Sequence, residues 1–194
     1  MYEIYHSKIL GLDTDQVSEG GITIQPIIFH LSEDQTRNEL YYPDKLLESK
    51  SYRIKYSVMF PETMPNEWCV AFQLMQFSGL NNVTNPTLQL NVKGDNCYWQ
   101  HKTTKQGPGA VFYQSPYIPG EYIHWAIDID ICRQDCNSAQ IVLFKNGVEV
   151  SQITGQTVVD VSQDVAIKYG LYAKLWPDKR YRISHVSKIQ VNQV

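Results

Sequence analysis

The stretch Ile167-Lys168-Tyr169-Gly170-Leu171-Tyr172-Ala173-Lys174 decides the fold of this chain. Its residues alternate in character, and successive side chains of a β-strand point to opposite faces. The face that begins with Ile167 is apolar, which predicts burial in a core. The opposite face carries Lys168, Tyr172 and Lys174 around Gly170. The stretch therefore predicts a strand with one buried face and one cationic face.

The cationic face has two interpretations. Two ammonium groups and a phenol on a sheet surface would suit a polyanion, yet lysine and tyrosine are also common on solvated outer faces. Gly170 weakens the packing of the strand, but it allows another group to approach the backbone closely. The strand by itself leaves both interpretations open.

Similar alternation recurs along the chain, and no segment shows a helical period. Asn146-Gly147 between two short strands is a strong hairpin signal. About a dozen strands with turns roughly every 8–12 residues predict an all-β, two-sheet antiparallel sandwich or jelly roll. We expect a single domain over residues 1–194, in which 1–30 form a leading segment and the first strand, and a long loop over 104–120. Strands are predicted at 21–29, where Pro26 indicates a sheet edge or a break, and at 35–41, 52–60, 68–77, 87–93, 97–103, 125–131, 141–144, 148–153 and 183–191.

Composition limits the functional classes. The chain has 194 residues, of which 43% are hydrophobic and 19% charged, with a net charge of −3. This composition is typical of a globular protein, and no apolar run approaches the ~20 residues of a membrane-spanning helix. The negative charge argues against nucleic acid as a partner, because nucleic-acid binding requires a basic surface. Any anion site must be a local patch.

The four cysteines predict no zinc site. Cys69, Cys97, Cys132 and Cys136 form no C-x-x-C pair, and the histidines are scattered. Cys132 and Cys136 could close a small disulfide loop, although free buried thiols are equally compatible with the sequence. No cluster of carboxylates requires calcium. We therefore predict no metal and no cofactor.

Three short motifs appear together in order. Arg37-Asn38-Glu39-Leu40 comes first, Gln73 lies in a buried strand, and the stretch from Lys168 to Tyr172 comes last; Pro86–Leu90, Trp125 and the Asn146-Gly147 hairpin lie between. Their order, spacing and strand parity make the chain resemble the jelly-roll polysaccharide lyases of the heparin lyase I and glucuronan lyase type, and more distantly the alginate lyases. Those families carry R-x-E-L, Q-x-H and K-x-G-x-Y strands. The resemblance covers about residues 35–191.

The resemblance implies a concanavalin A-like β-jelly roll whose concave sheet forms a groove for an acidic polysaccharide. Such lyases cleave beside a uronic acid by β-elimination: the carboxylate is neutralised, a base removes the proton on C5, and an acid protonates the departing oxygen. Arg37 and Gln73 would contact the carboxylate, and Tyr172 would be the acid and could also be the base. Lys168 and Lys174 would bind the sugar chain and could lower the pKa of Tyr172. Glu39 would orient Arg37 beside the substrate.

The sequence departs from this family at one position. The Q-x-H strand reads Gln73-Leu74-Met75, and a thioether cannot accept a proton. Tyr172 could act as both acid and base, or His101 or His30 could replace the missing histidine. Alternatively, the protein is a non-catalytic carbohydrate-binding or virion or cell-surface attachment domain of the same fold. Strict alternation places Gln73 and Met75 on one face, with Gln76, Trp68 and Val70 on the other.

The remaining candidates each have an ordinary structural explanation. Trp99 could stack on a sugar ring or anchor a strand by burial, and His101 could contact substrate or be a half-exposed histidine. Arg37 and Glu39 could form a simple ion pair. Asp128 and Asp130 could form the carboxylate pair of a glycoside hydrolase, although their alternation with isoleucines favours a solvated face.

The sequence says little about location. No signal peptide is visible at the N-terminus, and only the family resemblance favours an extracellular or virion-associated protein. The oligomeric state is not predicted.

Overall fold

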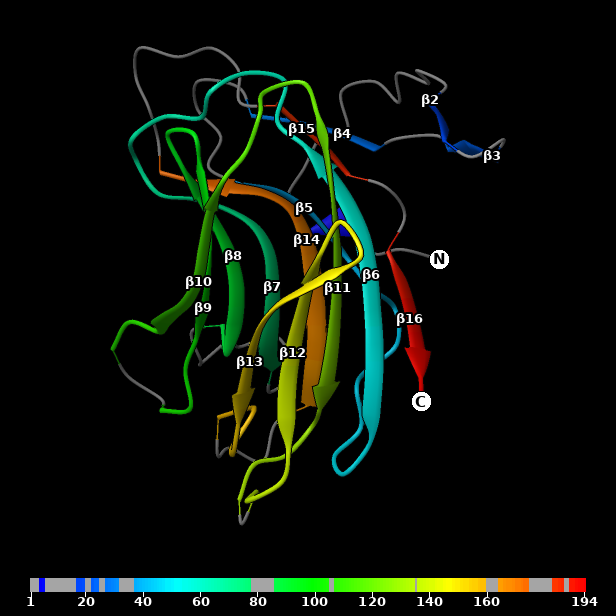
Figure 1. Ribbon diagram of the computed structural model, residues 1–194, viewed down its shortest axis with the longest axis vertical. Helices are drawn as coiled ribbons and strands as arrows, with labels where there is room; N and C mark the ends of the chain where they lie inside the picture. The colour runs from blue at the N-terminus through cyan, green and yellow to red at the C-terminus, as the bar shows by residue number, and fades with distance from the viewer. Residues whose placement is uncertain are drawn as a thin grey trace.

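The protein is described here by a computed structural model, in which every regular element of the described residues is a β-strand (Figure 1). Two antiparallel sheets pack face to face as a sandwich, which confirms the predicted all-β fold. Among the described residues, no helix is long and apolar enough to cross a membrane. The structure describes residues 4–5, 17–19, 22–24, 27–31, 37–77, 86–104, 107–134, 136–159, 164–174, 183–186 and 189–194.

The first sheet has seven strands in the order β1-β5-β14-β7-β8-β9-β10, and the second runs β13-β12-β11-β6-β15-β4, with β16 also paired to β6. A separate hairpin joins β2 to β3. The strands of the first sheet are β1 (Ile4–Tyr5), β5 (Arg37–Tyr41), β14 (Asp164–Ala173), β7 (Cys69–Phe77), β8 (Leu88–Lys93), β9 (Asn96–His101) and β10 (Ala110–Pro116). The others are β13 (Val148–Thr154), β12 (Gln140–Lys145), β11 (Tyr122–Asp130), β6 (Ser51–Met59), β15 (Ile183–Val186), β4 (Ile27–His30), β16 (Gln190–Gln193), β2 (Val17–Glu19) and β3 (Ile22–Ile24).

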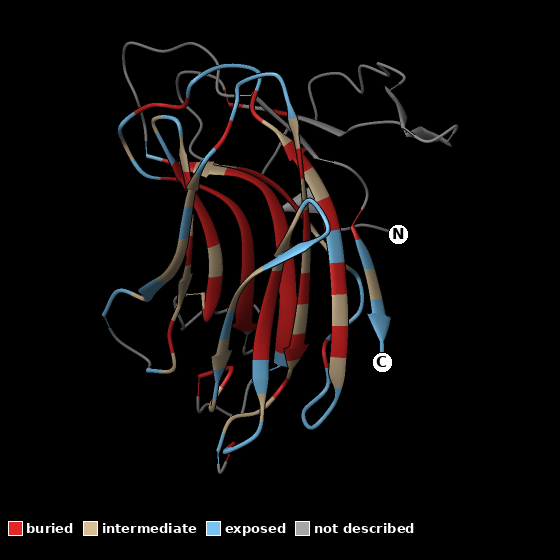
Figure 2. Ribbon diagram, viewed as in Figure 1, coloured by how far each residue is buried: buried red, intermediate tan, exposed pale blue. Residues whose placement is uncertain are grey.

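The core lies between the two sheets, where the alternating strands place their apolar side chains. Figure 2 shows buried positions concentrated along the facing strands. In β6, Ile54 and Val58 are fully buried, while Lys55 between them is exposed, as a period of two requires. Trp99 and Trp125 meet edge to face at the centre, with their ring centroids 5.5 Å apart.

Two predicted boundaries are wrong. The expected loop over 104–120 contains β10, which pairs along the outer edge of β9. Most β10 side chains are exposed or half-buried, so the strand lacks the alternation by which a strand is recognised in sequence. The expected strand over 183–191 is two strands, β15 and β16, both of which pair with β6.

A bulge in β7 changes which of its residues share a face. The register with β8 shifts between Val70 and Phe72, and Ala71 and Phe72 are both buried in the core. An extra residue of this kind reverses the alternation on one side of it. Trp68 and Val70 therefore lie on the same outer face as Gln73, which corrects the strict alternation expected from the sequence.

Gly170 permits the predicted close approach, and the group that approaches is strand β5. The φ angle of Gly170 is +141°, and a Cβ atom there would lie 2.5 Å from the Asn38 carbonyl oxygen and 2.8 Å from the Glu39 Cα. A residue with a side chain would collide with this backbone. The glycine thus allows β5 to lie close against β14 at Asn38 and Glu39.

Candidate active site

Cross-strand register builds two rows of side chains across the outer face of the first sheet. In one row, Lys168 of β14 pairs with Gln73, which pairs with Gln89, which pairs with Gln100. In the next row, Tyr172 lies between Arg37 of β5 and Val70 of β7. Residues that are distant in sequence are thus adjacent because antiparallel pairing aligns them.

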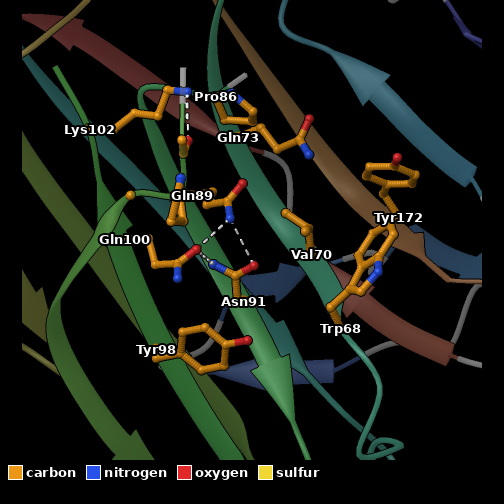
Figure 3. Close-up of a pocket in the computed structure, with 13 residues that line it drawn as sticks. Trp68, Val70, Gln73, Pro86, Gln89, Asn91, Tyr98, Gln100, Lys102 and Tyr172 are labelled. Atoms are coloured by element: carbon orange, nitrogen blue, oxygen red, sulfur yellow. Dashed lines mark hydrogen bonds between the residues drawn. The ribbon is translucent and has the colours of Figure 1, made fainter. Parts of the chain in front are cut away.

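A pocket of about 360 Å³ opens on this face, over β7, β8 and β9 (Figure 3). Its size falls in the range of pockets that hold small ligands. Its walls come from four strands of one sheet and from the segment after β9. The lining residues are Trp68, Val70, Gln73, Pro86, Gln89, Asn91, Tyr98, Gln100, Lys102, Gly107, Pro108, Gly109 and Tyr172.

Amide side chains form the floor of the pocket. The Gln89 amide nitrogen donates to Gln100 at 2.7 Å and to Asn91 at 3.0 Å, and the Asn91 nitrogen donates to Gln100 at 3.1 Å. Gln73 beside them is only 2% exposed, and its Oε1 has no hydrogen-bond partner among the described residues. An unpaired buried amide oxygen is costly, so Gln73 has hydrogen-bonding capacity available for a ligand.

Two side chains contact the ring of Tyr172. The Arg37 guanidinium lies over one face, 4.0 Å from the ring centroid, and the Trp68 indole meets the ring nearly at right angles with centroids 4.7 Å apart. Contacts of both kinds are attractive for aromatic rings. Figure 3 shows Tyr172 beside Trp68 at one wall of the pocket. The phenol is thus held in place at the pocket with a cation directly behind it.

A buried charge cluster lies next to Tyr172. Arg37 Nε is 3.2 Å from Glu39 Oε2, and the Glu39 side chain is 2% exposed. Burial raises the pKa of Glu39, and the charges of Arg37 and Lys168 partly offset that rise. Burial also lowers the pKa of Lys168 to about 8; Glu39 opposes that shift and Arg37 adds to it. Lys168 Nζ lies 4.9 Å from the ring centroid of Tyr41.

The structure brings most of the predicted site residues together. Gln73 and Tyr172 line the pocket, while Arg37, Glu39 and Lys168 form the adjacent cluster without lining it. Alternation along the strand favoured Gln73 over Gln76 as the residue on the outer face, and the structure agrees. Gln76 points to the opposite side of the sheet, where its amide nitrogen donates to the Val159 carbonyl at 2.9 Å.

Lys174 lies at the end of β14, away from the pocket lining. Its ammonium forms an exposed ion pair with Glu67, with a nitrogen–oxygen distance of 3.2 Å. An exposed pair of this kind contributes little to stability.

Two predicted substrate contacts lie elsewhere. Trp99 is fully buried against Trp125, so it anchors the core and cannot stack on a sugar. His101 is also turned from the pocket: its Nε2 lies 2.9 Å from the Thr157 carbonyl oxygen. Burial lowers the pKa of His101, and that hydrogen bond partly opposes the shift. Both residues alternate with Tyr98 and Gln100, which face outward. The side chain of His30 lies outside the described residues.

Lys102 is a pocket residue that the sequence analysis did not select. Its side chain is 6% exposed, and its Nζ donates to the Gly107 carbonyl oxygen at 3.2 Å. Burial lowers its pKa. The sequence does hold a signal for it: Lys102 follows Tyr98 and Gln100 at intervals of two, which predicts that the three side chains share one face. Among the described residues, no group of three or more His, Cys, Asp or Glu is arranged to hold a metal ion.

Comparison with known proteins bears on the fold and on the family of the chain. No curated protein matches the sequence. The structure is similar to an endo-β-1,4-glucuronan lyase from the fungus Trichoderma reesei, with a TM-score of 0.73 at 12% identity, covering 100% of this chain and 95% of that one. It is also similar to alginate lyase A1-II′, of polysaccharide lyase family 7, with a TM-score of 0.69 at 13% identity, covering 97% and 85%. An alginate lyase from Pseudomonas aeruginosa gives a TM-score of 0.60 at 15% identity, covering 87% and 83%.

At such identities, these likenesses establish the jelly-roll fold alone. The family assignment comes from the sequence: a family model described as polysaccharide lyase matches residues 11–190, nearly the whole length. The chain belongs to the polysaccharide lyase family.

Proposed function

We propose that this lyase cleaves a uronate-containing polysaccharide by β-elimination in the pocket on the first sheet. The observation that carries the proposal is the position of Tyr172, which lines the pocket together with Gln73 while Arg37 lies over its ring. An acid for the departing oxygen and a polar group for the carboxylate are thus present in one cavity.

The pocket suits a sugar with an acidic group. The amides of Gln73, Gln89 and Asn91 offer donors and acceptors to hydroxyl and carboxylate groups. Trp68 is 39% exposed at one side, so part of its indole is accessible for stacking on a sugar ring. The glucuronan and alginate lyases with this fold make their polymers the first candidates.

The charge cluster supplies a local field of the required sign. Arg37 and Lys168 carry more positive charge than the single carboxylate of Glu39 balances, although the whole chain is negative. The cluster lies behind Tyr172 and Gln73 rather than on the pocket surface. In the proposal, it favours an anionic sugar and stabilises the negative charge that develops on the carboxylate during proton removal.

In this reaction Tyr172 donates its phenolic proton to the glycosidic oxygen as the bond from that oxygen to C4 breaks. The phenol needs a fixed direction for this transfer, which the contacts with Arg37 and Trp68 provide. Loss of a positioned acid lowers the rate by about 10²–10⁴-fold.

The test is growth of ultraviolet absorbance from unsaturated uronate when the protein is incubated with glucuronan, alginate or heparin. We expect growth on at least one polymer, and a loss of kcat of about 10²–10⁴-fold in Tyr172→Phe. Tyr113→Phe removes a phenol from β10, outside the pocket lining, and is expected to retain wild-type kcat. Absence of growth on every polymer, or wild-type kcat in Tyr172→Phe, would contradict the proposal.

A further inference from the structure

We propose that Lys102 is the base that removes the C5 proton, in the role that Met75 cannot fill. This inference rests on the proposed β-elimination and assigns its second proton transfer. Four features support it: the place of Lys102 in the sheet, the position of its amine in the pocket, its burial, and the chemistry of the other candidates.

Lys102 and Met75 belong to the same cross-strand row. The Gln73–Gln89 register, continued by one residue, sets Met75 opposite Thr87, and the Thr87 backbone N–H donates to the Leu74 carbonyl at 2.9 Å. The Lys102 backbone N–H in turn donates to the Thr87 carbonyl at 2.8 Å. Lys102 therefore lies two strands away from Met75 in the same cross-strand row. Its long side chain can span part of the distance between the two strands.

The amine of Lys102 lies at the pocket wall away from Tyr172. Figure 3 shows Lys102 and Tyr172 on opposite sides, with Gln73 between them. The hydrogen bond from Nζ to Gly107 holds the amine there. A sugar whose carboxylate contacts Gln73 would thus lie between a nitrogen base and a phenolic acid, which separates the two proton transfers.

Burial favours the protonation state that a base requires. The Lys102 side chain is 6% exposed, and desolvation lowers the pKa of its ammonium. A neutral amine can donate one hydrogen to the Gly107 carbonyl and still present its lone pair to a substrate. Lysines desolvated in this way serve as general bases in enzymes.

The other candidates fit the role less well. Met75 has no basic atom, and His101 points toward the Thr157 carbonyl outside the pocket. Tyr172 could take the C5 proton only as a phenolate, whereas in the proposed division of roles it begins as a phenol and donates its own proton to the glycosidic oxygen.

The step balances without an outside oxidant or reductant. The Lys102 lone pair takes the C5 proton, and the electrons of the C5–H bond form the C4–C5 double bond. The bond between C4 and the glycosidic oxygen breaks, and that oxygen takes the proton of Tyr172. Afterwards the Lys102 ammonium loses its proton to water and the Tyr172 phenolate regains one.

Lys102→Ala, tested on the polymer that the wild type cleaves, separates a base from a structural lysine. We expect kcat to fall by about 10²–10⁴-fold while polymer binding is retained. Small primary amines added to this variant should restore part of kcat, in proportion to the neutral amine and more strongly for more basic amines. Lys102→Met keeps the side-chain volume and should show the same loss, with a melting temperature near that of the wild type.

The control is Lys55→Ala, which removes an exposed lysine from β6 in the second sheet and should leave kcat unchanged. Wild-type kcat in either Lys102 variant overturns the assignment, and so does a loss of kcat in Lys102→Ala that no amine restores. A wild type that makes no unsaturated uronate from any polymer overturns the proposed function, and this inference with it. If the wild type cleaves a polymer and Lys102→Ala cleaves it at the wild-type rate, this inference is overturned and the proposed function stands.

Discussion

Gly170→Ala tests whether the close contact between β14 and β5 depends on the absence of a side chain. The φ angle of +141° strains any residue other than glycine, at a cost of about 1–3 kcal/mol. The new Cβ would also lie 2.5 Å from the Asn38 oxygen, 2.8 Å from the Glu39 Cα and 2.9 Å from Phe29 Cε1. Two of these atoms are backbone and cannot rotate away, so overpacking adds about 1–3 kcal/mol. We expect the free energy of unfolding to fall by about 2–6 kcal/mol.

Gly155→Ala is the matched control. Gly155 has a φ angle of +115° but no atom within 4 Å of its ideal Cβ position, so only the backbone strain applies. Urea denaturation followed by tryptophan fluorescence measures both variants. Gly170→Ala should lose about 1–3 kcal/mol more than Gly155→Ala, because overpacking occurs only at the first site. Equal losses would refute the reasoning.

Three further predictions concern a buried lysine of the charge cluster, a tryptophan of the core and the disulfide. Between pH 8 and 10.5, Lys168 binds more protons in the unfolded state than in the folded state, so its contribution to the free energy of unfolding rises with pH in that window. Urea titrations should show this rise in the wild type but not in Lys168→Met. Wild-type and variant stabilities that change with pH in the same way would contradict the prediction. Trp99→Ala should lower the free energy of unfolding by about 3–5 kcal/mol, whereas a stable variant with weaker polymer binding would show that the indole contacts sugar. Replacing both Cys132 and Cys136 by serine should cost about 2 kcal/mol, because the disulfide closes only a short loop, and an unchanged melting temperature would contradict this.

The sequence specified the faces of the strands better than their ends. Alternation along β14 correctly predicted that Ile167, Tyr169 and Leu171 are buried in the core. It also predicted that Lys168 and Tyr172 lie on the opposite face, because each strand of a sandwich packs one face on the core. The same rule chose Gln73 over Gln76. It failed at β10, because an edge strand with few buried side chains shows no such alternation.

The contents of the pocket were harder to predict, because they depend on register between distant strands. The bulge in β7 adds Trp68 and Val70 to the face of Gln73, and no local signal marks it. Alternation with Tyr98 and Gln100 gives the face of Lys102, but its place in the pocket depends on the pairing of this segment with β8 at Thr87. The sequence left both roles of Trp99 open, because an aromatic residue in a strand has the same local pattern whether its ring binds sugar or fills the core.

Both alternatives for the cysteines occur in the structure. Cys132 and Cys136 form a disulfide, while Cys69 and Cys97 are buried thiols outside any disulfide. The short separation of the first pair makes that bond geometrically accessible. Alternation in β7 and β9 places the other two in the core.

Mass spectrometry of the products tests the central claim most directly. β-Elimination leaves a double bond at each new non-reducing end, so every such oligosaccharide should be lighter by one water than the hydrolytic product of equal length. The account predicts this mass for the wild type on at least one uronate polymer, and its near disappearance in Tyr172→Phe. Products with the full hydrolytic mass, or unsaturated products formed at the wild-type rate by Tyr172→Phe, would contradict it.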